Sequence, residues 1–263
     1  MLVLAAVPSL GLHRLRAVDS DHYDFVAVGS WIEVVEIIRR RPVEMAVVDP
    51  ILGGRPRVRE IERLRVLFPS LPLLLYTTLA PETAGILLQL GSMGIRRAIF
   101  SRFDDAPTSL HAALQAELET SASRRVLQSL AGALDGLPAR LRYVVETALH
   151  VPADTMTVDE LARRAQVKRR TCERWFARSA LPSPRTVLML ARLLYAHRLL
   201  LDPGYTVEDV TLKLGYGKTR TLQLQLKEVF GLTAGEFRLS LSIEEAVAIV
   251  TARYFPRLKR AAS

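Results

Sequence analysis

The first 105 residues alternate short apolar runs with amphipathic stretches. The apolar runs have the length and composition of strands buried on both faces: Leu2–Val7, Phe25–Val28, Met45–Val48, Leu73–Tyr76 and Ala98–Phe100. The stretches with helical spacing of apolar residues are Trp31–Arg40, Val58–Phe68 and Glu82–Leu90. Strands that alternate with helices predict a five-stranded parallel sheet covered on both sides. Residues 1–120 are therefore expected to form an α/β domain.

A leucine stripe follows the last predicted strand. Leu110, Leu114 and Leu118 share one helical face, and Val126, Leu130 and Leu134 continue the spacing until Asp135-Gly136-Leu137-Pro138 interrupts it. We expect residues 121–140 to be a helical linker. Such a stripe packs within its own chain or forms the seam of a homodimer, and the pattern leaves both open.

The remaining chain contains the same pattern twice. Thr157–Val167 and Thr206–Tyr216 each begin with a hydroxyl residue followed three positions later by a carboxylate, Glu160 or Asp209, which predicts a capped helix. Each is followed by a turn and a second amphipathic helix. Residues 141–240 are therefore expected to be an all-α domain with two helix-turn-helix units, able to read two stretches of major groove.

Two further helices are predicted around these units. Ser183-Pro184 begins a long connecting helix that ends near Leu201, before Asp202-Pro203-Gly204. Residues 241–263 are expected to form a helix from Ser242 to about Tyr254 and a basic tail, Arg257–Arg260.

This C-terminal half resembles the DNA-binding domain of the AraC family of bacterial transcription regulators. The resemblance extends over the whole stretch, through Leu161-Ala162, Arg174, Phe176, Ser183-Pro184, Arg192-Leu193, Ala196, Leu199-Leu200, Val210, Leu214-Gly215-Tyr216, Phe230-Gly231 and Phe237-Arg238. The chain departs from the family at Leu181, where a glycine is usual, at Ala234, where a proline is usual, and at Leu224, where the family often has a polar or basic residue. The resemblance implies binding to double-stranded DNA.

The first predicted reading helix runs from about Arg170 to Arg178. Cys172 and Phe176 lie four apart on its inward face, so Arg170, Glu173 and Arg174 point outward. Arginine pairs bidentately with guanine, and a carboxylate accepts from cytosine N4. By the resemblance, these positions match base-facing residues of the family. A phosphate contact remains the alternative for each arginine.

The second predicted reading helix has Leu222 and Leu226 inward. Its outer residues are Thr219, Arg220, Thr221, Gln223 and Leu224, and the cations at the two turns are Lys168, Arg169 and Lys218. Leu224 occupies the position equivalent to Arg174. An apolar side chain there touches at most a thymine methyl, so we expect the first helix to carry more sequence specificity.

The N-terminal half resembles a response-regulator receiver domain, which has a flavodoxin-like fold. Ala46–Asp49 ends the third predicted strand where a receiver has its phosphate-accepting aspartate; Thr77-Thr78 and Gly91 also match. The family's acidic pair is missing, because Pro8-Ser9-Leu10-Gly11 follows the first strand, and its lysine is missing because the first lysine is Lys168. Arg102 lies near that position but has a different geometry. We expect an atypical receiver that is not phosphorylated.

Charge separates the two halves. Residues 1–120 have 13 arginines, no lysine and 14 acidic residues, which gives a net charge of −1. Residues 121–263 have a net charge of +10, and the two halves sum to the total of +9. Positive charge near the predicted helix-turn-helix units favours binding to phosphates. Cys172 is the only cysteine, which excludes an intrachain disulfide and suits a reducing compartment.

Other function classes find little support. No apolar run reaches the length of a membrane span, and Met1–Val7 resembles a strand more than a signal peptide, so a soluble cytoplasmic protein is expected. The five histidines lack metal-ligand spacing. We expect no metal, no cofactor and no enzymatic activity.

The sequence thus predicts a sequence-specific transcription regulator controlled through its N-terminal domain. A small ligand, a regulatory protein or a second copy of the chain remains open as the controlling partner. Two alternatives are a response regulator phosphorylated at Asp49, and a protein-interaction regulator whose DNA binding is weakened at Leu224.

Overall fold

The computed structural model describes residues 1–18, 23–119, 128, 134, 137–150 and 156–255. Contacts divide the chain into two compact units: Met1–Ser121 with Asp202–Gly204, and Ala122–Leu201 with Tyr205–Ser263. Of the predicted features, Val126, Leu130 and the basic tail Arg257–Arg260 lie outside the described residues.

The first unit contains a five-stranded sheet whose strands are all parallel. Its order is β2-β1-β3-β4-β5, as predicted for an α/β domain. The strands are β1 (Leu2–Ala6), β2 (Asp24–Ala27), β3 (Val43–Val48), β4 (Leu73–Thr77) and β5 (Ala98–Phe100).

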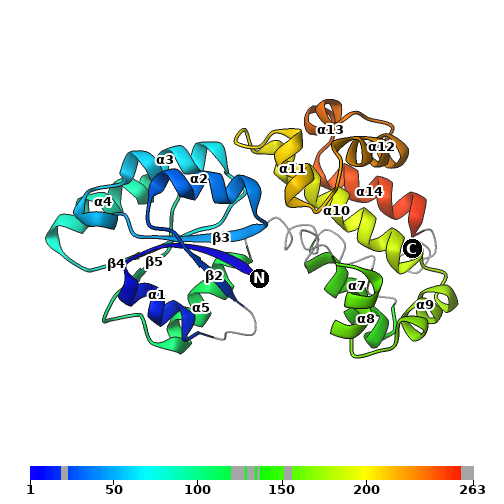
Figure 1. Ribbon diagram of the computed structural model, residues 1–263, viewed down its shortest axis with the longest axis horizontal. Helices are drawn as coiled ribbons and strands as arrows, with labels where there is room; N and C mark the ends of the chain where they lie inside the picture. The colour runs from blue at the N-terminus through cyan, green and yellow to red at the C-terminus, as the bar shows by residue number, and fades with distance from the viewer. Residues whose placement is uncertain (19–22, 120–127, 129–133, 135–136, 151–155, 256–263) are drawn as a thin grey trace. The chain divides into compact units, whose positions relative to one another are not determined.

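Helices cover both faces of this sheet. Figure 1 shows α2, α3 and α4 on one face and α1 and α5 on the other. Their bounds are α1 (Ser9–Arg16), α2 (Trp31–Arg40), α3 (Val58–Leu67), α4 (Pro81–Ser92) and α5 (Pro107–Leu118), and a short 3-10 turn, η1 (Leu52–Gly54), follows β3. Arrangements of this kind present the carboxyl ends of their strands at one edge of the sheet.

Burial corrects one expectation about the strands. β3 and β4 are buried along their whole length, as expected, but Asp24 and Ala27 of β2 are exposed. The reason is that β2 lies at the edge of the sheet and pairs with β1 alone.

Helix α1 has no counterpart in the sequence prediction. Its buried positions are Gly11 and Leu15, and the glycine hides the apolar period. A Cβ at Gly11 would lie 2.7 Å from Cε1 of Tyr76 on β4, so only glycine permits this close approach.

The leucine stripe packs within its own unit. Leu110, Leu114 and Leu118 of α5 are buried in the core formed with Val3, Met45 and other side chains of the sheet. This arrangement confirms the intramolecular alternative for that part of the stripe, and these three residues are not available as a dimer seam.

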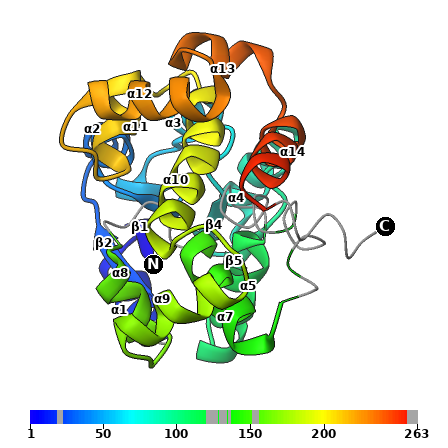
Figure 2. The ribbon, with the colours of Figure 1, turned by 90° about the vertical axis from the view of Figure 1, so that its right-hand side faces the viewer.

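The second unit is helical. Its described helices are α7 (Ala139–His150), α8 (Val158–Arg164), α9 (Arg169–Arg178), α10 (Pro184–Leu201), α11 (Val207–Lys213), α12 (Thr219–Phe230), α13 (Ala234–Ser240) and α14 (Ile243–Tyr254). The connecting helix α10 packs against all the others. Figure 2 shows α8 and α9 at one end of α10 and α11 and α12 at the other. The predicted fold class, an α/β domain with a five-stranded parallel sheet followed by an all-α domain, is confirmed. The helix pairs α8–α9 and α11–α12 lie at the two predicted helix-turn-helix units.

None of the described helices combines the length and the apolar composition needed to cross a membrane.

Candidate nucleic-acid interface

The turns of the two helix-turn-helix units begin in the same way. The Val167 amide donates to the Ala162 carbonyl at 2.9 Å, and the Tyr216 amide donates to the Thr211 carbonyl at 3.0 Å. The left-handed residue of the turn is Gln166 in the first unit, with φ 54°, and Gly215 in the second, with φ 68°.

The second turn is one residue longer than the first. Two residues separate Gln166 from the start of α9, whereas three, Tyr216–Lys218, separate Gly215 from the start of α12. Because of the extra residue, α12 begins four positions after the left-handed residue of its turn, whereas α9 begins three positions after its own. Arg174 therefore corresponds to Leu224, the equivalence that the sequence predicted.

The predicted N-terminal caps form completely in only one unit. Thr206 Oγ1 accepts from the Asp209 amide at 3.1 Å, and the Asp209 carboxylate accepts from the Thr206 amide at 2.9 Å. Thr157 also accepts from the Glu160 amide, at 3.2 Å. The Glu160 carboxylate does not return to Thr157 because it is occupied by Arg163 and Arg164. The reciprocal arrangement expected at Glu160 is therefore absent.

The two reading helices begin differently from their neighbours. Five helices around them, α8, α10, α11, α13 and α14, are capped by hydroxyl side chains. The capping residues are Thr157, Ser183, Thr206, Thr233 and Ser242, in that order. Lys168 and Lys218 stand at the N-caps of α9 and α12, and neither side chain caps its helix. First-turn amides without a side-chain acceptor, next to a lysine, suit an anion such as phosphate.

Helix α9 presents arginines on its outer face. Cys172 and Phe176 are buried, with 0% and 1% exposure, whereas Arg170 and Arg174 are exposed. Neither arginine side chain has a hydrogen bond or ion pair with any residue in the described part of the chain. Their guanidinium groups are therefore available to an external acceptor.

Glu173 and Arg169 lie on the flank of α9 and bind each other. Arg169 Nε donates to Glu173 Oε1, and Arg169 Nη1 donates to Asp159 Oδ2, both at 2.9 Å. Glu173 and then Asp159 hold the pKa of the Arg169 guanidinium above its usual value. The Glu173 carboxylate is exposed, as expected, but it is already paired with Arg169 in the absence of DNA.

Helix α12 has a more mixed outer face. Leu222 and Leu226 are buried, with 0% exposure, as predicted. Arg220, Thr221 and Gln223 are exposed, Thr219 is half-buried, and Leu224 is 59% exposed. Arg220 is thus the one arginine on this face, beside an exposed apolar residue.

Two of the three departures from the AraC pattern, at Leu181 and Ala234, are accommodated locally. Ala180, not Leu181, takes the left-handed conformation after α9, with φ 52°, and Leu181 is buried with its amide bonded to the Phe176 carbonyl. Ala234 is the first residue of α13, where Thr233 and Glu236 form a reciprocal cap. Neither substitution disturbs a reading helix.

Asp49 lies at the carboxyl end of β3, where the receiver resemblance places it. The Ile51 amide donates to Asp49 Oδ1 at 2.9 Å, and Thr77 Oγ1 donates to the same oxygen at 3.3 Å. Burial raises the pKa of this carboxyl group, against the opposing effect of the two hydrogen bonds. Within the described ranges, no three His, Cys, Asp or Glu side chains gather to hold a metal ion.

Comparison with protein families supports the helical half of this interface. A family model described as a helix-turn-helix domain matches residues 161–240. No curated protein sequence matches the chain.

Three solved structures are similar to parts of the chain. A DNA-binding transcriptional dual regulator from Escherichia coli K-12 is 16% identical, with a TM-score of 0.36, over 39% of this chain and 92% of its own. Full-length FixJ from B. japonicum is 14% identical, with a TM-score of 0.38, over 88% of this chain and 98% of its own. RcsB from Salmonella enterica serovar Typhimurium, bound to promoter rprA, is 14% identical, with a TM-score of 0.36, over 71% of this chain and 96% of its own.

The chain therefore carries a helix-turn-helix domain over residues 161–240, and this match supports DNA-binding transcription regulation as its class of function.

Proposed function

We propose that this protein is a sequence-specific regulator of the AraC type that reads two adjacent major-groove segments of double-stranded DNA. The observation that carries the proposal is the repeated reading face: Arg170 and Arg174 on α9, and Arg220 on α12, project from equivalent helices attached to one rigid connecting helix. Arginine is the commonest side chain in specific contacts to guanine.

The starts of the two reading helices support contacts to DNA phosphates that are separate from the contacts to bases. Lys168 and Lys218 stand at the starts of α9 and α12, whose first-turn amides have no side-chain acceptor. Phosphate contacts at these positions fix the register of each helix, while the outward side chains select bases. The second reading face also includes Thr219, Thr221 and Gln223. On the first reading helix, Glu173 positions the Arg169 side chain through their hydrogen bond.

A selection from random-sequence duplexes with the full chain tests the proposal. The expected result is an enriched site with two conserved blocks whose centres lie about 10 base pairs apart, one turn of the duplex. Binding that shows no preference above unselected DNA would instead favour a protein-interaction regulator with weakened DNA binding.

We further propose that the N-terminal domain is controlled by a ligand, a protein or a second copy of the chain, rather than by phosphorylation. Asp49 is buried and its Oδ1 already accepts two hydrogen bonds. The discriminating experiment incubates the chain with acetyl phosphate and Mg²⁺ and measures its mass. We expect no added phosphoryl group, and an Asp49-dependent increase in mass would establish the phosphorylated alternative.

A further inference from the structure

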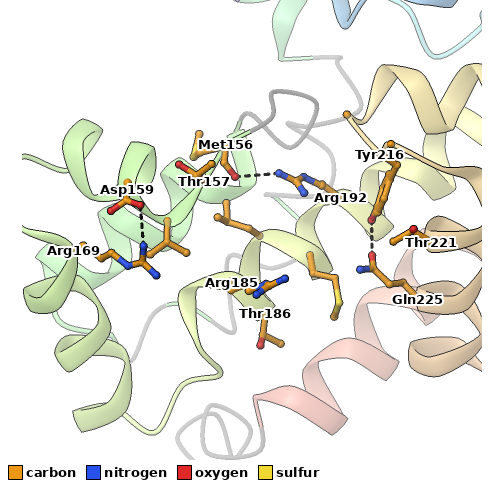
Figure 3. A pocket seen from close by; sticks show the side chains of 15 residues that line it. Met156, Thr157, Asp159, Arg169, Arg185, Thr186, Arg192, Tyr216, Thr221 and Gln225 are labelled. Carbon is orange, nitrogen blue, oxygen red and sulfur yellow. Dashed lines mark hydrogen bonds and ion pairs between the residues drawn. The ribbon is translucent and has the colours of Figure 1, made fainter.

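A groove of mixed polar and apolar lining lies between the two helix-turn-helix units. It has a volume of about 620 Å³, and its floor is the first half of α10, which contributes Arg185 and Arg192. Asp159 and Arg169 of the first unit form one wall, and Thr221 and Gln225 of α12 form the other. Figure 3 shows these side chains around the space, with Asp159 and Arg169 on one side and Tyr216 and Gln225 on the other.

The groove is rich in hydrogen-bond donors. Arg192 is anchored by a 3.0 Å hydrogen bond from Nη2 to the Met156 carbonyl. Gln225 Oε1 accepts from the Tyr216 hydroxyl at 2.7 Å, and the amide nitrogen of Gln225 has no acceptor among the residues that the structure describes. Arg185 is exposed and has no hydrogen bond or ion pair with any described residue. The groove therefore suits an anion.

Its position identifies the anion. Two helices that enter successive major grooves on one face of a duplex have one minor groove between them, bordered by the two phosphate backbones. The groove lies between α9 and α12, so this stretch of DNA must face it when both helices are inserted. Resting on the proposed function, we propose that Arg185 binds the phosphodiester backbone that separates the two major-groove segments.

Asp159 opposes this contact. Its carboxylate lines the same groove and holds Arg169, which Glu173 also holds. A carboxylate next to a phosphate path repels it, and a phosphate that enters competes for Arg169. Asp159 therefore limits the affinity of the domain for any DNA sequence, and Arg169 exchanges a carboxylate for a phosphate on binding.

The dependence of binding on salt tests both residues in the full chain. Each phosphate contact contributes about 0.9 to the slope of log affinity against log salt concentration. Arg185→Ala is expected to reduce that slope by about 1 on selected and unselected duplexes alike, with unchanged base preferences. Asp159→Asn is expected to increase affinity about two- to fivefold at low salt.

The control variant is Arg163→Ala. Arg163 is an exposed arginine of α8 that pairs with Glu160 and does not line the groove. Arg163→Ala removes the same charge as Arg185→Ala. The slope of log affinity against log salt concentration for Arg163→Ala is expected to equal that of the unchanged protein. Thermal unfolding of each variant verifies folding.

The possible outcomes distinguish failure of the groove proposal from failure of the proposed DNA-binding function. An Arg185→Ala slope equal to that of the unchanged protein, or weaker binding by Asp159→Asn, overturns the groove proposal and leaves sequence-specific binding intact. Absence of all duplex binding by the unchanged chain overturns both. A slope reduced by Arg163→Ala as much as by Arg185→Ala assigns the effect to net charge and also overturns the groove proposal.

Discussion

The Tyr216 hydroxyl donates a 2.7 Å hydrogen bond to Oε1 of Gln225. The bond joins the turn of the second helix-turn-helix unit to the middle of its reading helix, α12. Burial raises the pKa of Tyr216 to about 12, and the charge of Arg192 opposes this only in part. The phenol therefore remains protonated, and the donor is present, throughout the range in which the protein would act.

Tyr216→Phe removes this donor while retaining the ring. Because a partly buried acceptor loses its partner, the free energy of unfolding is expected to fall by about 1 kcal/mol. Denaturant titration measures the change. Tyr143→Phe is the matched control, because Tyr143 is 55% exposed and its hydroxyl has no hydrogen bond with the described residues. An equal loss in both variants would contradict the role of the Tyr216 bond.

The elements that the sequence predicted are those with a strong period or a cap. The bounds of Trp31–Arg40 and Ala98–Phe100 agree with α2 and β5, and Ser242 caps α14 as expected. The sequence does not predict helix α1, because its buried position nearest β4 is Gly11, which has no side chain to mark the period. Apolar periodicity finds a helix only where packing uses large side chains.

The reading faces were predictable and the groove between them was not. Arg170 and Arg220 follow from the buried pairs Cys172/Phe176 and Leu222/Leu226, which fix the outward direction of each helix. Arg185 and Asp159 belong to different elements, and only the fold brings them to one groove. The pairing of Arg169 with Asp159 likewise depends on the angle between α8 and α9, which no periodicity encodes.

His197 predicts a pH-dependent stability. It is fully buried in α10, its Nε2 lies 2.7 Å from the Leu241 carbonyl, and its ring packs against Phe237. Burial lowers the pKa of His197; the Leu241 bond opposes this, Arg198 adds to it and Glu244 opposes it. The unfolded chain therefore binds a proton more readily than the folded one.

Stability is accordingly expected to be full above the unfolded pKa of about 6.5 and to fall as pH decreases toward the lower folded pKa. Denaturant midpoints measured across this window check the result. His197→Gln retains a donor for the Leu241 carbonyl, and we expect it to lose this part of the pH dependence. Identical profiles for the two proteins would show that another group is responsible.

Cys172 predicts slow thiol chemistry. Its side chain is 0% exposed inside α9, and burial, followed by the charge of Glu173, raises the pKa of the thiol. The thiolate is the reactive species, so the folded protein is expected to resist a thiol reagent such as 5,5′-dithiobis(2-nitrobenzoate) at pH 7.5 and to react fully once unfolded. Stoichiometric labelling of the folded chain within minutes would reveal an accessible thiol and would contradict the expected resistance.

Arg174 and Leu224 predict that the two half-sites are read unequally. They occupy equivalent outward positions on α9 and α12, and both are exposed. A bidentate arginine contact to guanine discriminates against other bases by about 1–3 kcal/mol, whereas a leucine contributes at most an apolar contact to thymine. Arg174→Ala is therefore expected to relax the preference at one base pair of the first block, and Leu224→Ala to leave the preferences of the second block nearly unchanged.

Competition among duplexes that differ at single positions measures both effects. Arg220→Ala provides the comparison within α12: because Arg220 is the exposed arginine of that face, its loss is expected to weaken the second block more than Leu224→Ala does. A uniform loss of affinity across all sequences for Arg174→Ala would assign this residue to a phosphate instead. A larger loss of preference for Leu224→Ala than for Arg174→Ala would show that the second helix is the main reader.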